Sequence, residues 1–246
     1  MSTQILKLIR TCGLVMAGSA LLSAAPVTVL SYDMLNGEGH TFSYRDKSYN
    51  GSGDPTLSLS PLSNGKGLLT DGMTGITDFT ANLGNGPAYE WVGWAIDPQA
   101  GGLPIDTNDN FATITFKLAN AVTLNSISLF INNFGGISGV GIFSSATVSV
   151  SNDNVNFVNP ILFTPNAADI ANTTARFVTI PLNEVSPFQY VRVHLTHLNA
   201  TTNNWIFLSE VTFDGTVVTA ATPEPSSVML SILGLLGLAL KVRRRS

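Results

Sequence analysis

Six side chains in this sequence have the chemistry that recognition of a sugar requires. They are Tyr89, Trp91, Trp94, Arg192, His194 and Trp205. An aromatic ring can cover the apolar face of a pyranose, and basic or amide side chains can bond its hydroxyl groups. These residue types predict a glycan-binding site, for which His197 and Asn204 are further polar candidates.

Sequence spacing limits how many of these groups can face one ligand. Trp91 and Trp94 are three positions apart, so on an extended strand they face opposite ways, and at most one should be exposed. Packing in the core is the alternative role for each aromatic residue. His194 and His197 also fall on opposite faces of a strand, which makes them poor partners for a metal ion.

Signatures of common catalytic sites are absent from the sequence. It contains no GxSxG, HExxH or phosphate-loop motif. The acidic segment Asp106–Asn110 lacks the glycine and distal glutamate of an EF-hand loop. We therefore expect a binding protein and not an enzyme. A polysaccharide hydrolase stays open, because the proximity of two catalytic carboxylates depends on the fold and not on spacing.

Charges are few and unevenly distributed, at 11% of the 246 residues. All sixteen acidic residues lie between Asp33 and Glu224, where only six basic residues lie, so this stretch has a formal charge of −10. The six basic residues are Arg45, Lys47, Lys66, Lys117, Arg176 and Arg192. Because phosphate backbones repel such a body, we expect no nucleic-acid partner.

The first 25 residues have the pattern of a secretory signal peptide. Lys7 and Arg10 form a basic region, Gly13–Leu22 is apolar, and small residues up to Ala25 offer signal peptidase a cleavage zone. An uncleaved anchor is the alternative. The sole cysteine, Cys12, lies in this segment, so the mature chain should lack disulfides, thiolate zinc sites and cysteine nucleophiles.

The tail, residues 222–246, has three parts. Pro223, Glu224 and Pro225 interrupt regular structure, because each proline fixes φ and lacks an N–H. Residues 226–242 are mostly apolar and, at about 1.5 Å per residue, reach about 25 Å as a transmembrane helix. The basic end, residues 241–245, contains Lys241, Arg243, Arg244 and Arg245, which the cytoplasmic side of the membrane retains. A plain tail anchor is one interpretation.

The order of Pro-Glu-Pro, a short apolar helix and an arginine-rich end resembles the PEP-CTERM sorting domain of Gram-negative bacteria. The resemblance covers Pro223–Ser246. It implies that exosortase, a membrane enzyme, recognises the tail and cleaves near the motif. It also implies export through the inner membrane, with transient residence there, and a final place at the cell surface or outside the cell.

The body, residues 27–221, is predicted to be one all-β domain, an antiparallel β-sandwich or jelly roll. Short alternating runs end at Gly, Asn, Asp, Ser or Pro, and no segment keeps a helical period for long. The clearest strands are Thr113–Leu118, Ser126–Ile131, Ala146–Ser151, Arg176–Pro181, Tyr190–Leu195 and Phe207–Phe213. The stretch 36–72 should combine loops with one or two early strands.

Alternation also predicts which side chains of these strands face the core. In the first strand they are Ile114, Phe116 and Leu118. In YVRVHL they are Val191, Val193 and Leu195, which leaves Arg192 and His194 on the other face. A turn is predicted at 151–154, because Asn and Asp tolerate positive φ.

A series of motifs follows one another along the body. They are LLTDG at 68–72, Trp91 and Trp94, ITFKL, SISLFI, TVSVSNDNVNF at 147–157, FQYVRVHLT at 188–196 and WIFLSEVTFDG at 205–215. In this order they resemble the discoidin or coagulation-factor C-domain superfamily, a galactose-binding jelly roll shared by many carbohydrate-binding modules. The resemblance covers about Leu68–Gly215. It implies that loops at one end of the sandwich bind glycans or lipid headgroups.

The same resemblance implies a structural calcium ion. The superfamily takes ligands from the loop with the TDG motif and from a glutamate near the final strand, and these positions match Asp71 and Glu210. Calcium takes roughly six to eight oxygens, so backbone carbonyls and Thr74 or Thr77 would complete the set. The residues around these threonines depart from the common pattern. The alternative makes Asp71 a turn residue and Glu210 an exposed strand carboxylate.

Together, these features predict an exported, exosortase-processed protein whose sandwich binds exopolysaccharide or a surface glycan without catalysis. A structural biofilm-matrix protein without a sugar pocket is the main alternative, and a polysaccharide hydrolase is a third. Exposed aromatic residues at one loop end would favour glycan binding, and buried ones the matrix protein. Two carboxylates facing each other across a cleft would favour the hydrolase.

Overall fold

The structure is a computed structural model that describes residues 27–38, 44–77, 90–96, 112–133, 140–198 and 204–218. Within these ranges, no helix has both the length and the apolar character needed to cross a membrane. The predicted signal peptide, the sorting tail with its transmembrane helix, Tyr89 and Asp106–Asn110 lie outside the described residues.

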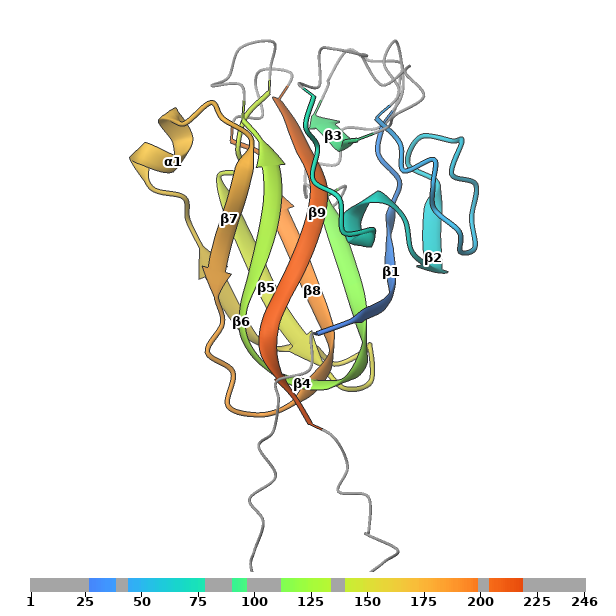
Figure 1. Cartoon of the computed structure of the whole chain (residues 1–246), viewed down its shortest axis with the longest axis vertical. Coiled ribbons are helices and arrows are strands. Elements are labelled where there is room, and N and C mark those ends of the chain that lie inside the picture. The colour runs from blue at the N-terminus through green and yellow to red at the C-terminus, as the bar shows by residue number, and fades with distance from the viewer. Residues whose placement is uncertain are drawn as a thin grey trace, which may run out of the picture.

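The described residues form an antiparallel β-sandwich, which confirms the predicted fold class (Figure 1). One layer has the strand order β2-β1-β4-β8-β5-β6 and is called here the six-stranded sheet. Its strands are β1 (Val29–Leu35), β2 (Pro61–Gly65), the first half of β4 (Thr113–Asn132), β5 (Ser145–Ser151), β6 (Val158–Phe163) and β8 (Phe188–Thr196).

The other layer, the four-stranded sheet, contains the second half of β4. Its remaining strands are β3 (Val92–Ile96), β7 (Arg176–Pro181) and β9 (Asn204–Val217). β9 pairs with β3 and with β4, while β7 pairs with the opposite edge of β4. β4 therefore belongs to both layers, and Figure 1 shows it turning at the lower end of the sandwich.

This turn of β4 also brings the two ends of the described domain together. The N–H of Ala119 donates to the carbonyl of Thr28 at 2.9 Å, and the N–H of Val218 donates to the carbonyl of Ala121 at 2.9 Å. Both ends of the domain therefore leave from one corner of the sandwich (Figure 1).

The core lies between the two sheets and follows the predicted alternation. Ile114, Phe116 and Leu118 are all fully buried, as are Val191, Val193 and Leu195. From the four-stranded sheet they meet a second alternating set, which consists of Ile127, Leu129 and Ile131. Burying each such aliphatic side chain contributes about 1.5–3 kcal/mol, so this layer is the main source of stability.

Two short helical elements lie within the described part of the domain, namely η1 (Leu68–Thr70) and α1 (Ala167–Ala171). Asn166 begins α1 with a capping box, because its side chain accepts from the N–H of Asp169 while the Asp169 carboxylate accepts from the N–H of Asn166. The predicted turn after β5 contains Asn154 at a φ of 60°. Asp153 closes it by accepting two backbone N–H bonds.

Candidate functional site

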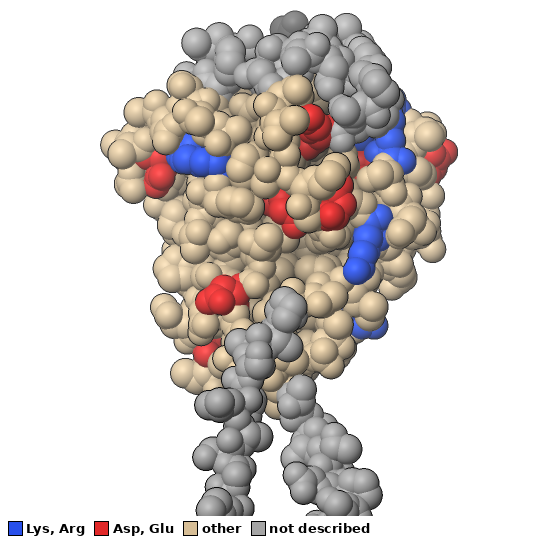
Figure 2. Space-filling model, viewed as in Figure 1, with Lys and Arg blue, Asp and Glu red and all other residues tan. Residues whose placement is uncertain are grey.

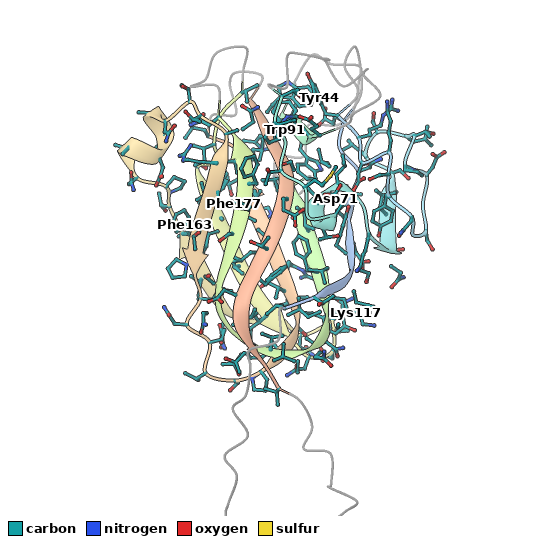
Figure 3. All side chains as sticks on the ribbon, viewed as in Figure 1. Tyr44, Asp71, Trp91, Lys117, Phe163 and Phe177 are labelled. Carbon is teal, nitrogen blue, oxygen red and sulfur yellow. The ribbon has the colours of Figure 1, made fainter. Side chains whose placement is uncertain are left out.

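The structure brings the predicted carboxylate pair together beside β9. Glu210 is only 5% exposed, and its Oε2 accepts the N–H of Gly72 at 3.0 Å. Asp71 immediately follows η1, is exposed, and accepts the N–H of Met73 at 2.8 Å (Figure 3). The burial of Glu210 rules out the alternative that made it an exposed strand carboxylate.

Burial changes the acidity of Glu210. The pKa of its carboxyl is raised from 4.5 to about 7, mainly by loss of solvent and also by the negative charge of Asp71, whereas N–H bonds from Gly72 and Met73 act against the rise. Among the described residues, no cation forms an ion pair with Glu210. A bound cation would offset both the burial and the repulsion between the two carboxylates.

The residues that line the cavity beside Glu210 offer oxygen donors to a metal, and Lys66 adds one positive charge. A cavity of about 420 Å³ is lined by Glu210, Thr70, Gly72 and Lys66, among others. Thr70 Oγ1 is buried and has no hydrogen-bond partner in the described chain. No group of three or more His, Cys, Asp or Glu side chains gathers within the described ranges. This oxygen-only set fits calcium better than a metal that prefers nitrogen or sulfur.

The two threonines predicted as additional ligands differ in their surroundings. Thr77 donates its hydroxyl to Glu90 Oε2, which also accepts the N–H groups of Ile76 and Thr77. Thr77 is therefore committed to Glu90. Thr74 lies in the same loop and lines a smaller pocket together with Asp71.

A buried aspartate that the sequence analysis missed holds the loop that carries Asp71. Asp46 has no exposed surface and accepts from Tyr32 OH, from Ser48 Oγ at 2.9 Å and from the N–H of Leu68 at 3.2 Å. A Cβ on Gly67 would lie 2.3 Å from this carboxylate. Asp46 therefore fixes where η1 begins, and burial raises its pKa. Its setting, RDKS, is typical of an exposed turn and gave no signal of burial.

Trp91 and Trp94 are both core residues. Trp94 is 0% exposed between the sheets, and its Nε1 donates to the carbonyl of Leu35 at 2.9 Å. Trp91 is 3% exposed, stacks on Phe130 with ring centroids 5.9 Å apart, and donates to the carbonyl of Thr77. They belong to different clusters and so face opposite ways, as predicted, but neither offers a ring to a ligand.

Trp205 is half-buried at the start of β9. Its ring lies parallel to that of Phe207, with centroids 5.5 Å apart, and meets the edge of Tyr44 at 5.3 Å. Figure 3 places Tyr44 and Trp91 near the end of the sandwich at β3, far from the β4 corner. The described aromatic residues at this end therefore pack mainly on one another.

Arg192 and His194 lie side by side on the outer face of the six-stranded sheet, as alternation predicted. The strand register aligns three residues at each level of this face. The levels are Thr113–His194–Thr147, Thr115–Arg192–Ser149 and Lys117–Tyr190–Ser151. All but Ser151 are partly exposed. These eight partly exposed residues, together with Phe157 from the β5–β6 connection, are called here the Arg192 platform.

Aromatic rings hold the two cations of the platform. The guanidinium carbon of Arg192 lies 3.6 Å from the centroid of the Phe157 ring, and its Nε donates to Thr115 Oγ1 at 3.3 Å. Lys117 Nζ lies 5.8 Å from the centroid of Tyr190. Burial lowers the pKa of Arg192, yet a guanidinium stays charged at any physiological pH.

Imidazole and hydroxyl groups extend the platform beside Arg192. His194 Nδ1 and Thr113 Oγ1 are 2.8 Å apart. By contrast, His197 is buried and its Nε2 bonds the carbonyl of Trp94, so it belongs to the core and not to this face. The side chain of Asn204 lies outside the described residues.

The opposite face of the molecule differs in character. Figure 2 looks onto the side of β9 and shows acidic side chains near the middle of that face, with basic ones toward its margins. The outer face of the six-stranded sheet lies behind this view, since β8 and β5 run behind β9 in Figure 1. The carboxylate pair and the Arg192 platform are thus separate sites.

Two family matches cover most of the chain. Residues 28–215 match the family described as discoidin domain-containing receptor 1/2, DS-like domain. Residues 221–245 match the PEP-CTERM protein-sorting motif, which directs export to the cell envelope. The first match begins at β1 and so takes in two strands that precede Leu68.

A related protein and several solved structures are also similar. Over 174 residues the chain is 30% identical to the discoidin domain-containing receptor tyrosine kinase B of Caenorhabditis elegans, spanning 70% of this chain and 19% of that receptor. The C-terminal domain of a Bacteroides fragilis chitobiase is 16% identical, with a TM-score of 0.41 over 80% of this chain and 99% of that one. A Streptococcus pneumoniae fucose-binding module is 14% identical, with a TM-score of 0.36 over 58% and 77%.

Proposed function

Because this chain belongs to the discoidin domain-containing receptor 1/2 DS-like domain family, we propose that its sandwich is a recognition module that binds exopolysaccharide or another surface glycan without catalysis. The PEP-CTERM motif supports export through the inner membrane of a Gram-negative bacterium and processing by exosortase. In this proposal the glycan contacts the Arg192 platform and not the loop end of the sandwich.

One observation carries the proposal, namely the stacking of Arg192 on Phe157 at the centre of an exposed sheet face. Ring, cation and hydroxyl groups lie there within one plane of strands, which is the mixture that sugar recognition requires. Residues of β4, β5 and β8 hold these groups in register, so they need little rearrangement on binding.

The burial of Trp91 and Trp94 argues against a second sugar surface built on those rings. By the criterion of exposed aromatic residues, the described residues at the loop end favour a protein that only fills space in a matrix. The platform favours glycan binding over the matrix role, because a cation stacked on an exposed face serves recognition of a ligand and not the filling of space.

Calcium is the second part of the proposal. Asp71 and Glu210 would hold the ion, and the unpartnered hydroxyl of Thr70 and loop carbonyls are the nearest additional oxygen donors. Bound calcium would supply positive charge to a buried carboxylate and join the loop after η1 to β9. Its role in this proposal is stability and not sugar contact, since the platform lies on the other layer.

The same carboxylate pair supports a second candidate function. A glycoside hydrolase uses two neighbouring carboxyl groups, one of which has a raised pKa and acts as the acid. Glu210 has a raised pKa and lines the cavity, and Asp71 is its neighbouring carboxylate. This candidate requires that Glu210→Gln abolish release of reducing sugar from a polysaccharide substrate, whereas the calcium role requires that it abolish stabilisation by calcium.

A glycan array probed with residues 27–221 tests the binding proposal. We expect binding that Arg192→Ala weakens at least tenfold, since hydrogen bonds to charged groups contribute about 1.5–3 kcal/mol. Arg176→Ala is the matched control, because it removes the same charge from the edge of the other sheet. Absence of any glycan binding by the folded wild-type protein would favour the matrix protein instead.

A further inference from the structure

Arg192 differs from Arg176, another half-buried arginine, in the acceptors that its N–H groups reach. Arg176 donates to the carbonyls of Asp169, Asn172 and Thr174 and forms an ion pair with the Asp169 carboxylate at 3.4 Å. For Arg192, the described chain offers only Thr115 Oγ1 as an acceptor and no carboxylate within ion-pair distance. Most of its five N–H donors are therefore available to a ligand.

The stacking geometry decides which ligand group suits those donors. With one face of the guanidinium against Phe157, its N–H groups point outward around the edge of the plane. A guanidinium edge matches a carboxylate, because two parallel N–H···O bonds can form at once. Partial burial of Arg192 strengthens such a pair, since less water competes for the charge.

A second cation lies on the same face. Tyr190 is two residues from Arg192 on β8, about 6.6 Å along the strand, and its register partner on β4 is Lys117. Two of the six basic residues of an acidic body thus share one small surface. Figure 3 shows Lys117 near the β4 corner, so the platform ends near that corner.

The carboxylates nearest to these cations are already engaged. Asp33 of β1 pairs in register with Thr115 and accepts the N–H of Asn64 at 2.8 Å. Asp153 accepts the N–H groups of Val155 and Asn156 within its own turn. Neither forms an ion pair with Arg192 or Lys117 in the described chain, so both cations can pair with a carboxylate of a ligand.

Building on the proposed function, we infer that the Arg192 platform selects glycans that carry carboxylate groups, that is, uronic acid residues. Arg192 binds the uronate carboxylate through its guanidinium edge, and Lys117 adds a longer-range attraction. His194 and the hydroxyl groups of Thr113, Thr147 and Ser149 bond the neutral hydroxyls of the chain. The local positive charges of Arg192 and Lys117, on one face of an otherwise acidic body, decide between acidic and neutral glycans.

Titration calorimetry of residues 27–221 with trigalacturonate and with its methyl ester tests this inference, because esterification removes the charge and keeps the sugar. We expect the acid to bind at least tenfold more tightly than the ester. Arg192→Ala should remove that preference and Arg192→Lys should restore only part of it, since lysine lacks the planar fork. Arg176→Ala should leave both affinities unchanged, and the melting temperature of each variant shows that it is folded.

The outcomes separate this inference from the function on which it rests. Equal binding of acid and ester, still weakened by Arg192→Ala, would overturn uronate selection and leave glycan binding at the platform intact. Tighter binding of a sulfated trisaccharide than of trigalacturonate would also overturn the preference for carboxylate. If no glycan in either titration or on the array binds the folded protein, the proposed function itself fails.

Discussion

Gly72 and Glu210 are 138 positions apart in the sequence, yet the N–H of Gly72 donates to Oε2 of Glu210 at 3.0 Å. This bond joins the loop after η1 to the middle of β9. It leaves a buried carboxylate facing Asp71 with no ion-pair partner among the described residues. The hydrogen bond therefore stabilises the fold, while no positive charge of the described chain pairs with the Glu210 carboxylate.

Stability of the calcium-free protein should fall as pH rises from about 4.5 to about 7. In this window the folded chain keeps a proton on Glu210 that the unfolded chain has released, so raising the pH favours unfolding. The loss should be about 1–2 kcal/mol, less than the full pKa difference implies, because the cavity beside Glu210 lets solvent screen its carboxylate. Urea denaturation in the presence of a chelator at several pH values measures it.

Glu210→Gln provides the internal comparison for that experiment. Glutamine keeps an oxygen for the N–H of Gly72 but does not titrate, so the variant should show a flatter dependence on pH. Some dependence on pH should remain in this variant, because the pKa of Asp46 is also raised and its ionisation also destabilises the folded chain as pH rises. A slope equal to that of the wild type would contradict the assignment to Glu210.

Calcium should raise the melting temperature of the wild-type protein, since an ion that binds only the folded state stabilises it by an amount that grows with the logarithm of the ion concentration. At one hundred times the dissociation constant the gain is about 2.7 kcal/mol. Asp71→Asn and Glu210→Gln should each abolish most of the increase in scanning calorimetry. Glu184→Gln, which alters a carboxylate that bonds Asn159, is the control and should keep it.

Asp46→Ala should lower the free energy of unfolding by about 3 kcal/mol or more, because two buried donors and one exposed donor lose their acceptor. These donors are the hydroxyls of Tyr32 and Ser48 and the N–H of Leu68. Ser48→Ala removes a single bond and should cost about 1 kcal/mol. Chemical denaturation compares the two, and equal losses would show that the carboxylate acts through Ser48 alone.

The tryptophans should differ in their effect on stability. Trp94→Ala should cost about 3–5 kcal/mol, because its ring is fully buried between the sheets. Trp205→Ala should cost less than half of that, since its ring is half-exposed and rests on Phe207. Denaturant midpoints measure both, and a larger loss for Trp205 would contradict the observed burial.

Replacing Pro223, Glu224 and Pro225 with alanine should leave the full-length protein as an uncut precursor in the membrane fraction. The matched motif begins three residues beyond Val218, the last described residue. Immunoblots of membrane and extracellular fractions measure processing. Normal release of the triple variant would exclude recognition of Pro-Glu-Pro by exosortase.

Alternation was the most reliable guide to the fold because it is a local property of the chain. In β8 it correctly placed Val191, Val193 and Leu195 inside and Arg192 and His194 outside. The predicted strands at 113–118 and 126–131 are instead two halves of β4. Their continuity arises from pairing with different neighbours, which local patterns do not encode.

Some strands were not predicted because they contain residues that usually interrupt strands. β6 contains Pro160 and Asn159, the latter at a φ of 51°, and it forms the edge of its sheet, where such residues are tolerated. β1 and β3 lacked a clear alternation. Neither Phe157 nor Asp46 could be assigned from sequence, because the turn after β5 and the burial of the 44–50 segment decide their contacts.

The membership of β4 in both sheets has a mechanical consequence. A pull on a glycan held by Arg192 enters β4 through β8, and a pull on the tail enters β9 through Val218. β4 and β9 are paired from Val122–Val217 to Asn132–Phe207, and both loads reach this ladder at its Val122–Val217 end. The pairs nearest to the β4 corner therefore carry the load first. A cell tethered by this tail would therefore transmit drag to its matrix through a continuous β-ladder.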